Sequence, residues 1–356
     1  MNFVRKQSSK NLFNVVSLFA GGGGSSTGYR LAGGKVLGIN EFIPAAQEVY
    51  HRNYPDTHIF TQDVRQLTGK MILDQFDLKK GELDILDGSP PCASFSAAGL
   101  REKGWGRIKK YSDSEQRTDD LFFEFVRILK EVQPKTFVAE NVKGLTMGAA
   151  VHLLGSDQLD LFGKYKDTIY HSLVGAGYKV RFKVINAKSF GVPQSRPRII
   201  FIGVRNDIDE KVTYPEGSLN HFTVGDAIGD LVNSEKEIQE STHSEGIVKN
   251  YVKMMKEGES GSQYAPSGYH GLIRVRRDKP SPTICARQGN KGACLLHWED
   301  DRELTVSEII LLSSFPQDYY LGEKYTQKTE RMGRAVPPLM MKAVAENIYE
   351  TILKHL

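Results

Sequence analysis

The sequence predicts an α/β fold, with a parallel sheet covered by helices on both faces and a smaller, loop-rich unit attached to it. Short β-rich runs alternate with helical patterns over the first two hundred residues. A glycine-rich turn follows the first run, and the periodicity weakens after Arg205. We therefore expect a main unit over residues 1–205, a smaller unit over 206–290, and a return to the main unit over 291–356.

The individual elements follow from local patterns. Runs of four to eight apolar and β-branched residues, bounded by turn residues, predict strands, whereas longer runs with apolar residues three or four apart predict helices. The helix at 121–132 has apolar residues at 121, 122, 125, 126, 128 and 129. In chain order, we expect strands at 15–19, 35–40, 58–61, 83–86, 136–139, 178–185 and 199–204, and helices at 25–31, 45–54, 121–132, 305–312 and 338–353.

Composition limits the protein class. The 356 residues carry a net charge of +4 and three cysteines, Cys92, Cys285 and Cys294, which favours a reducing compartment, here the cytoplasm, over a disulfide scaffold. We expect no membrane span, no signal segment and no metal site, because long apolar runs and clustered Cys/His ligands are missing from the sequence. Residues 246–291 hold nine Lys/Arg against three acids, which suits a polyanion, although a solvated basic face is the alternative.

The segment from Asp87 to Gly99 points to a nucleophile. An apolar run leads to Gly88, and Pro90 and Pro91 stiffen the backbone directly before Cys92. Small residues follow, so the thiol is accessible, as a nucleophilic cysteine requires. A buried structural cysteine in a proline-bearing turn is the alternative.

The first strand ends in a candidate nucleotide loop. Phe19 begins a stretch that contains Gly21 and Gly23 and opens a helix, so a ligand could approach its backbone at the carboxyl edge of the sheet. Glu41 ends the second strand and could bind two ribose hydroxyls, and Asp63 follows the third and could reach an adenine amino group. Helix capping by the two acids is the alternative.

Taken together, these motifs resemble the DNA (cytosine-5) methyltransferase family. The resemblance rests on Phe19 to Gly28, Gly88 to Ser96, Ala139-Glu140-Asn141-Val142, Gln194-Ser195-Arg196-Pro197-Arg198, Arg302-Glu303-Leu304-Thr305 and Gly333 to Pro337, in that order. It implies a Rossmann-like S-adenosylmethionine-dependent methyltransferase sheet, with the 206–290 unit as target-recognition domain. It also implies a monomeric bacterial or phage enzyme that acts on double-stranded DNA, with a cognate restriction enzyme as a further expected partner.

The resemblance assigns roles to residues. Cys92 would add to cytosine C6, Glu140 would contact N3, and Arg196 and Arg198 would hold the O2 side of the ring. The target base would be flipped out of the duplex, and the loop from Ser96 to Tyr111 would close over it. The expected contacts to S-adenosylmethionine are Phe19, Gly21, Gly23, Glu41, Asp63, Pro90, Arg334, Ala335 and Val336.

Two positions depart from the family pattern. Ser307 stands where the family has an arginine, and we expect altered packing there. Arg334 stands where the family has an asparagine beside the donor. It could pair with a carboxylated S-adenosylmethionine, which would make the enzyme a carboxymethyltransferase, or it could face solvent or a DNA phosphate. A catalytically quiet DNA-binding relative and a tRNA cytosine methyltransferase are the remaining alternatives.

Overall fold

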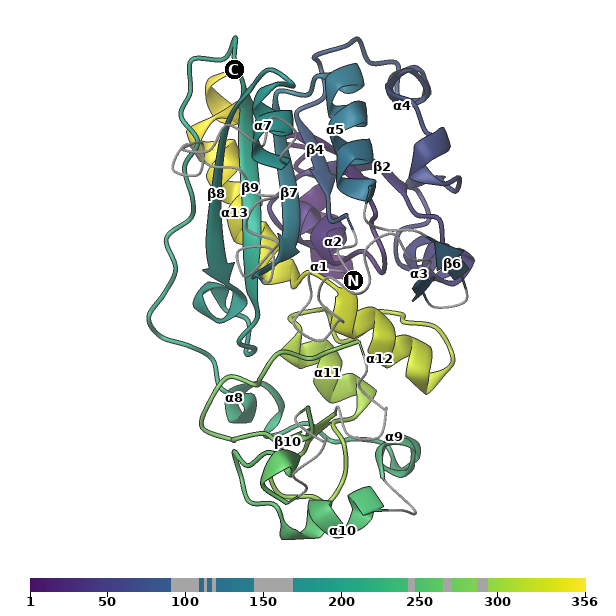
Figure 1. Cartoon of the computed structure of the whole chain (residues 1–356), viewed down its shortest axis with the longest axis vertical. Helices are drawn as coiled ribbons and strands as arrows, with labels where there is room; N and C mark the ends of the chain where they lie inside the picture. Colours follow the sequence, from purple (N-terminus) through teal and green to yellow (C-terminus); the bar gives the residue numbers. More distant parts are fainter. Residues whose placement is uncertain are drawn as a thin grey trace, which may run out of the picture.

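A seven-stranded sheet forms the centre of the larger part of the molecule (Figure 1). The structure is a computed structural model that describes residues 1–90, 109–111, 114–116, 120–143, 169–242, 247–264, 271–286 and 294–356, without side-chain detail at 109–111, 114–116 and 247–250. The sheet order is β3-β2-β1-β4-β7-β9-β8. Its strands are β1 (Asn14–Leu18), β2 (Lys35–Asn40), β3 (His58–Phe60), β4 (Ile85–Gly88), β7 (Thr136–Val142), β8 (Tyr178–Asn186) and β9 (Pro197–Arg205). All seven predicted strands are confirmed, with boundaries shifted by a few residues.

The direction of the strands differs from the prediction at one position. Strands β3, β2, β1, β4 and β7 are parallel, but β9 runs antiparallel to both β7 and β8. Only residues 187–196 join β8 to β9, which is too short for the crossover helix that parallel neighbours need. The expectation of a wholly parallel sheet is therefore wrong for β9.

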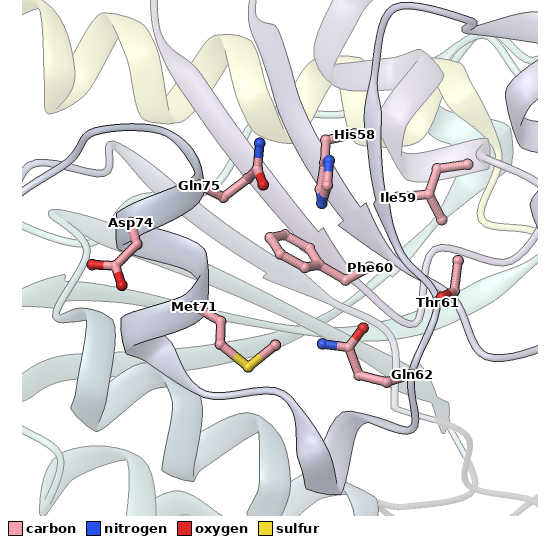
Figure 2. Close-up of a pocket in the computed structure, with 8 residues that line it drawn as sticks. All are labelled: His58, Ile59, Phe60, Thr61, Gln62, Met71, Asp74 and Gln75. Atoms are coloured by element: carbon pink, nitrogen blue, oxygen red, sulfur yellow. The ribbon is translucent and has the colours of Figure 1, made fainter.

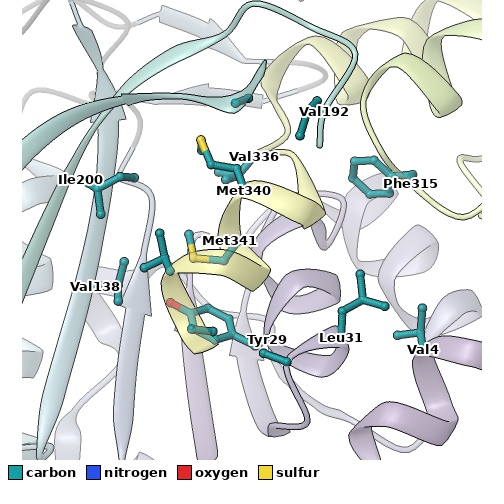
Figure 3. Close-up of a cluster of buried hydrophobic side chains, with 14 of the residues drawn as sticks. Val4, Tyr29, Leu31, Val138, Val192, Ile200, Phe315, Val336, Met340 and Met341 are labelled. Carbon is teal, nitrogen blue, oxygen red and sulfur yellow. The ribbon is translucent and has the colours of Figure 1, made fainter. Parts of the chain in front are cut away.

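Alternating side chains of each strand enter two apolar cores. On β7, Phe137 and Ala139 belong to one core and Val138 to the other. The helices that bring residues to the first core include α2 (Gly24–Leu31), α3 (Pro44–Asn53) and α13 (Pro338–Thr351), and those of the second are α4 (Gly69–Gln75), α5 (Leu121–Val132) and α7 (Ile169–Val174). Figure 3 shows Met340 and Met341 of α13 among Tyr29, Val138 and Ile200. The C-terminal helix therefore packs into the apolar core beside the sheet.

The smaller unit lies beyond one end of this sheet (Figure 1). It contains the short helices α8 (Val224–Ile228), α9 (Glu235–Ser241) and α10 (Ile247–Met254) and the two-residue strands β10 (Ile273–Arg274) and β11 (Leu295–Leu296). It has its own small core of Val252, Met255, Leu272, Cys294 and Leu296. Helices α11 (Val306–Leu312) and α12 (Tyr325–Arg334) lie between this unit and the sheet (Figure 1).

The sequence patterns missed several short elements. Helix α1 (Asn2–Ser8), α4, α12 and the short pair β5 (Lys109–Tyr111) and β6 (Ser114–Gln116) were not predicted. Residues just after β9 also pack on the main unit, because the Lys179 ammonium donates to the Ile208 carbonyl (2.6 Å) and the Tyr214 hydroxyl to the Ile200 carbonyl (2.9 Å). Within the described ranges, no helix is long and apolar enough to cross a membrane.

Candidate active site

Glu41 stands at the carboxyl end of β2, where it joins the strand to the glycine-rich turn. The Gly21 N–H donates to its Oε2 (2.7 Å) and the Ile43 N–H to its Oε1 (2.7 Å). Burial raises the pKa of Glu41, while these backbone donors and the positive charge of Arg331 act in the opposite direction. The Phe42 N–H also donates to this carboxylate, so about one of its four lone-pair positions remains for a further donor, such as a ribose hydroxyl.

The glycines of the turn have two different structural roles. Gly21 and Gly23 have φ of 54° and 86°, a region that favours glycine. A Cβ at Gly21 would meet no atom within 4 Å, whereas one at Gly24 would lie 2.2 Å from the Val336 carbonyl oxygen. Gly24 is therefore needed for packing against residues 335–337, while open space beside Gly21 lets a ligand reach the backbone. The open space and the adjacent Glu41 carboxylate fit the adenosyl end of S-adenosylmethionine.

The other predicted cofactor contacts lie around this edge. Asp63 accepts the Arg65 backbone N–H (2.9 Å) and pairs with the Arg65 guanidinium (3.0 Å), so its capping role is confirmed, and a contact to adenine stays a prediction. Phe42, which the sequence reasoning missed, follows Glu41 directly and is 38% exposed. Its place directly after a strand-end acid was visible in the sequence, and its exposed ring offers an apolar face at this edge of the sheet.

Glu140 and Arg198 form the centre of the second cluster. Glu140 lies near the end of β7 and Arg198 near the start of the neighbouring β9, and Arg198 Nε lies 2.8 Å from Glu140 Oε1. Burial lowers the pKa of Arg198, and the Glu140 carboxylate raises it again. The Asn141 amide donates to the Pro90 carbonyl (3.4 Å), so the chain leading to Cys92 passes beside this pair. Cys92 itself lies outside the described residues, as do Arg101 to Arg107 of the predicted loop.

Arg196 occupies a different environment from Arg198. It is 2% exposed, and its two terminal nitrogens donate to the carbonyls of Ile284 and Gly333, both at 2.8 Å. Burial lowers its pKa well below the ordinary value. The two terminal nitrogens of Arg196 are therefore bound to the backbone of two distant segments, whereas its buried Nε has no hydrogen-bond partner among the described residues.

Both departures from the family pattern have local partners. Arg334 Nη2 lies 2.7 Å from Glu330 Oε1, one turn earlier in α12. The Ser307 hydroxyl donates to Glu237 Oε1 (2.6 Å) of α9, so the substituted position connects α11 to the smaller unit. At the position where the family has an arginine, Ser307 therefore contacts the smaller unit through one hydrogen bond to Glu237.

A concave pocket elsewhere does not coincide with these clusters. It has a volume of about 540 Å³ and lies at the outer edge of β3, between that strand and α4 (Figure 2). Its lining includes His58, Phe60, Met71 and Gln75 but none of the predicted site residues. The candidate active site is therefore defined by the Glu41 cluster and the Glu140–Arg198 pair and not by this pocket. Among the described side chains, no group of three or more His, Cys, Asp or Glu residues is arranged to hold a metal ion.

The sheet, with a glycine-rich turn after its first strand and Glu41 after its second, is the arrangement expected of an α/β enzyme that binds a nucleoside cofactor. A family model for C-5 cytosine-specific DNA methylases matches residues 13–350. Type II methyltransferase M1.HphI of Haemophilus parahaemolyticus is 35% identical over 348 residues, which cover 94% of this chain and 86% of the relative. Type II methyltransferase M.Eco47II of Escherichia coli is 30% identical over 366 residues, with 97% and 81% coverage.

Solved structures share the fold. A chain from E. coli, described as a DNA modification methyltransferase encoded within a prophage, superposes with a TM-score of 0.72 at 20% identity and covers 95% of this chain and 99% of its own. DNMT2 of Spodoptera frugiperda superposes with a TM-score of 0.64 at 17% identity, with 93% and 97% coverage. The chain belongs to the C-5 cytosine-specific DNA methylase family. It is an S-adenosylmethionine-dependent enzyme that methylates cytosine in DNA.

Proposed function

We propose that the reaction takes place where Glu140, Arg198 and Pro90 meet, with Cys92 as the nucleophile. The observation that carries this proposal is the buried 2.8 Å pair between Glu140 and Arg198 at the end of β7, beside the chain that leads to Cys92. A carboxyl group and a guanidinium held together in this way match the N3 and O2 edge of a cytosine ring.

Each residue then has a defined task. The Cys92 thiolate forms a bond to C6, and the electron pair displaced into the ring is stabilised at N3 by a proton shared with Glu140. Arg198 donates to O2 and keeps Glu140 oriented through their ion pair. The methyl group that C5 gains would come from the sulfonium of S-adenosylmethionine, which would leave as the neutral thioether. Loss of the C5 proton and departure of the Cys92 sulfur restore the aromatic ring.

Arg196 has a positioning role in this proposal. Both of its terminal nitrogens are bound to the carbonyls of Ile284 and Gly333, so only its Nε, which has no hydrogen-bond partner among the described residues, could still face the base. The sequence-based prediction gave both arginines the same task. The hydrogen bonds support a division in which Arg196 holds the Ile284 and Gly333 segments in place around the site.

For the cofactor, we propose that Glu41 binds the ribose hydroxyls and that Phe42 and Phe19 lie along the adenine ring. Asp63 would take the adenine amino group, and Gly21, Gly23, Pro90, Ala335 and Val336 would contribute backbone and apolar contacts. The ion pair between Glu330 and Arg334 supports a local role for Arg334 rather than recognition of a carboxylated donor, because Glu330 already meets its charge. A carboxylated donor would have to compete with the Glu330 carboxylate for the Arg334 guanidinium.

For DNA, we propose that the smaller unit, predicted at 206–290, reads the target site. The pairing of β10 with β11 and the shared core extend this unit to Leu296. Within this unit, residues 246–291 hold nine Lys/Arg against three acids, and this segment is the one suited to contact with phosphates. Since the relatives above are named Type II methyltransferases, we propose a cytoplasmic, monomeric modification enzyme that works beside a cognate restriction enzyme.

The decisive experiment uses duplex DNA whose target cytosine is replaced by 5-fluorocytosine. The fluorine cannot leave as a proton does, so a covalent enzyme–DNA adduct should accumulate with the parent and should be absent with Cys92→Ser. Cys285→Ser, which changes an exposed cysteine, is the control and should retain the adduct. An adduct with Cys92→Ser would exclude Cys92 as nucleophile, and activity on tRNA but not on duplex DNA would exclude the proposed substrate.

A further inference from the structure

Arg331 of α12 lies directly over the glycine-rich turn. A Cβ at Gly22 would lie 3.0 Å from Arg331 Cγ and 3.2 Å from its Cδ, so the aliphatic stem covers this glycine. Arg331 was not among the site residues expected from the sequence. Its position brings a residue from the C-terminal part of the chain onto the turn that follows β1.

The guanidinium of Arg331 connects two further segments. Its Nη1 donates to the Leu321 carbonyl and its Nη2 to the Ala45 carbonyl (3.1 Å), which belongs to the first turn of α3. The Tyr319 hydroxyl donates to the Gly22 carbonyl (2.5 Å) from the same region. One side chain thus joins the glycine-rich turn, α3 and the segment before α12.

The charge of Arg331 also acts on Glu41. The positive charge of Arg331 opposes the rise in the pKa of Glu41 that burial causes. In turn, burial lowers the pKa of Arg331, and the negative charges of Glu330, Glu41 and Glu48 oppose that fall. Arg331 is partly buried, so solvent screens this attraction less than it would screen a surface pair.

We propose that Arg331 is a positioning residue for the sulfonium donor. By joining the turn at Gly22 to the start of α3, it fixes the two segments on either side of Glu41, and it supplies a positive charge that favours the ionised form of Glu41. The inference rests on the proposed cofactor site, because its effect on the donor passes through Glu41 and the glycine-rich turn.

The test compares Arg331→Met, Arg331→Lys and Arg52→Met. Methionine keeps an aliphatic stem over Gly22 but loses the charge and both hydrogen bonds, and lysine keeps the charge. Arg52 is the matched control, because it is a 62% exposed arginine on α3 that lies near Glu48 but does not touch the turn. The measurements are calorimetric affinity for S-adenosylmethionine, affinity for duplex DNA without cofactor, thermal unfolding, and the KM and kcat of methylation.

We expect Arg331→Met to weaken S-adenosylmethionine binding about tenfold, as loss of charge-assisted hydrogen bonds does, with KM for the donor rising and kcat at saturation nearly unchanged. Arg331→Lys should weaken S-adenosylmethionine binding less than Arg331→Met does. Arg52→Met should change this affinity by no more than about twofold. DNA affinity without cofactor should stay the same in all three variants, whereas a loss caused by misfolding would lower it and the unfolding temperature together.

Glu41→Gln separates the two proposals. If Glu41→Gln weakens donor binding and Arg331→Met does not, the inference about Arg331 is wrong and the cofactor site stands. If neither variant affects donor binding, the proposed cofactor site itself is wrong. An equal loss of DNA and donor affinity in Arg331→Met and Arg331→Lys would also overturn the inference, since it would indicate a general structural role.

Discussion

Replacing Asp87 by asparagine should make the stability of the protein less dependent on pH between about pH 4 and pH 7. Asp87 lies on β4, 1% exposed, and accepts hydrogen bonds from the Ser17 hydroxyl (2.6 Å) and the Tyr29 hydroxyl (3.1 Å). Burial raises its pKa from 3.8 to about 7, with a further upward contribution from the charge of Glu140, while the two hydrogen bonds oppose the rise. Asparagine has a similar shape but does not titrate.

The sign follows from the raised pKa. The folded state binds the Asp87 proton more tightly than the unfolded state does, so the contribution to stability is fully present below about pH 4 and is lost as the pH rises to about 7. A shift of about three units corresponds to about 4 kcal/mol at most, and the part lost between pH 5 and pH 7 is about 2.5 kcal/mol. Relative to the parent, Asp87→Asn should therefore gain stability as the pH rises through this range.

The assay is urea unfolding of the parent and of Asp87→Asn at pH 5, 6 and 7, from which the difference in free energy of unfolding is plotted against pH. Asp207→Asn is the control, because Arg205 lowers the pKa of the exposed Asp207 and places its titration below this range. A difference between parent and Asp87→Asn that stays constant from pH 5 to pH 7 would refute the reasoning.

Three further predictions concern the turn, α11 and the donor. Gly24→Ala should lower the unfolding temperature more than Gly21→Ala, because its Cβ would lie 2.2 Å from a carbonyl oxygen. A Cβ at position 21 has open space and incurs only about 1–2 kcal/mol of left-handed backbone strain. Equal losses in the two variants would contradict the packing argument. Ser307→Ala should lower the free energy of unfolding, measured with urea, by about 1 kcal/mol through loss of the bond to Glu237, and an unchanged free energy would contradict this reasoning. Arg334→Asn should leave the preference between S-adenosylmethionine and its carboxylated analogue unchanged in a competition assay that identifies the product by mass, because Arg334 pairs with Glu330. A tenfold fall in use of the carboxylated donor would instead assign donor selection to Arg334.

The predicted site residues differ in how much of their environment the sequence could define. Glu41 was found because it ends an apolar strand, and parallel strands bring their carboxyl ends to one edge of the sheet, whereas Glu140 was assigned by the resemblance to the family. Asp63 was assigned two alternative roles, and the structure confirms the capping one. Phe42 was missed, although its place after Glu41 was visible in the sequence.

The sequence by itself determined the strands, the main helices and the order of motifs, because periodicity of two or 3.6 residues and turn chemistry are local properties of the chain. Only the tertiary structure decided that β9 runs antiparallel, that Arg196 is bound to Ile284 and Gly333 while Arg198 pairs with Glu140, and that Arg331 covers Gly22. These partners are separated by tens to hundreds of residues. Arg196 and Arg198 look alike in a motif, but Arg196 lies just before β9 and Arg198 within it. Their different partners depend on which distant segments the fold brings beside each one.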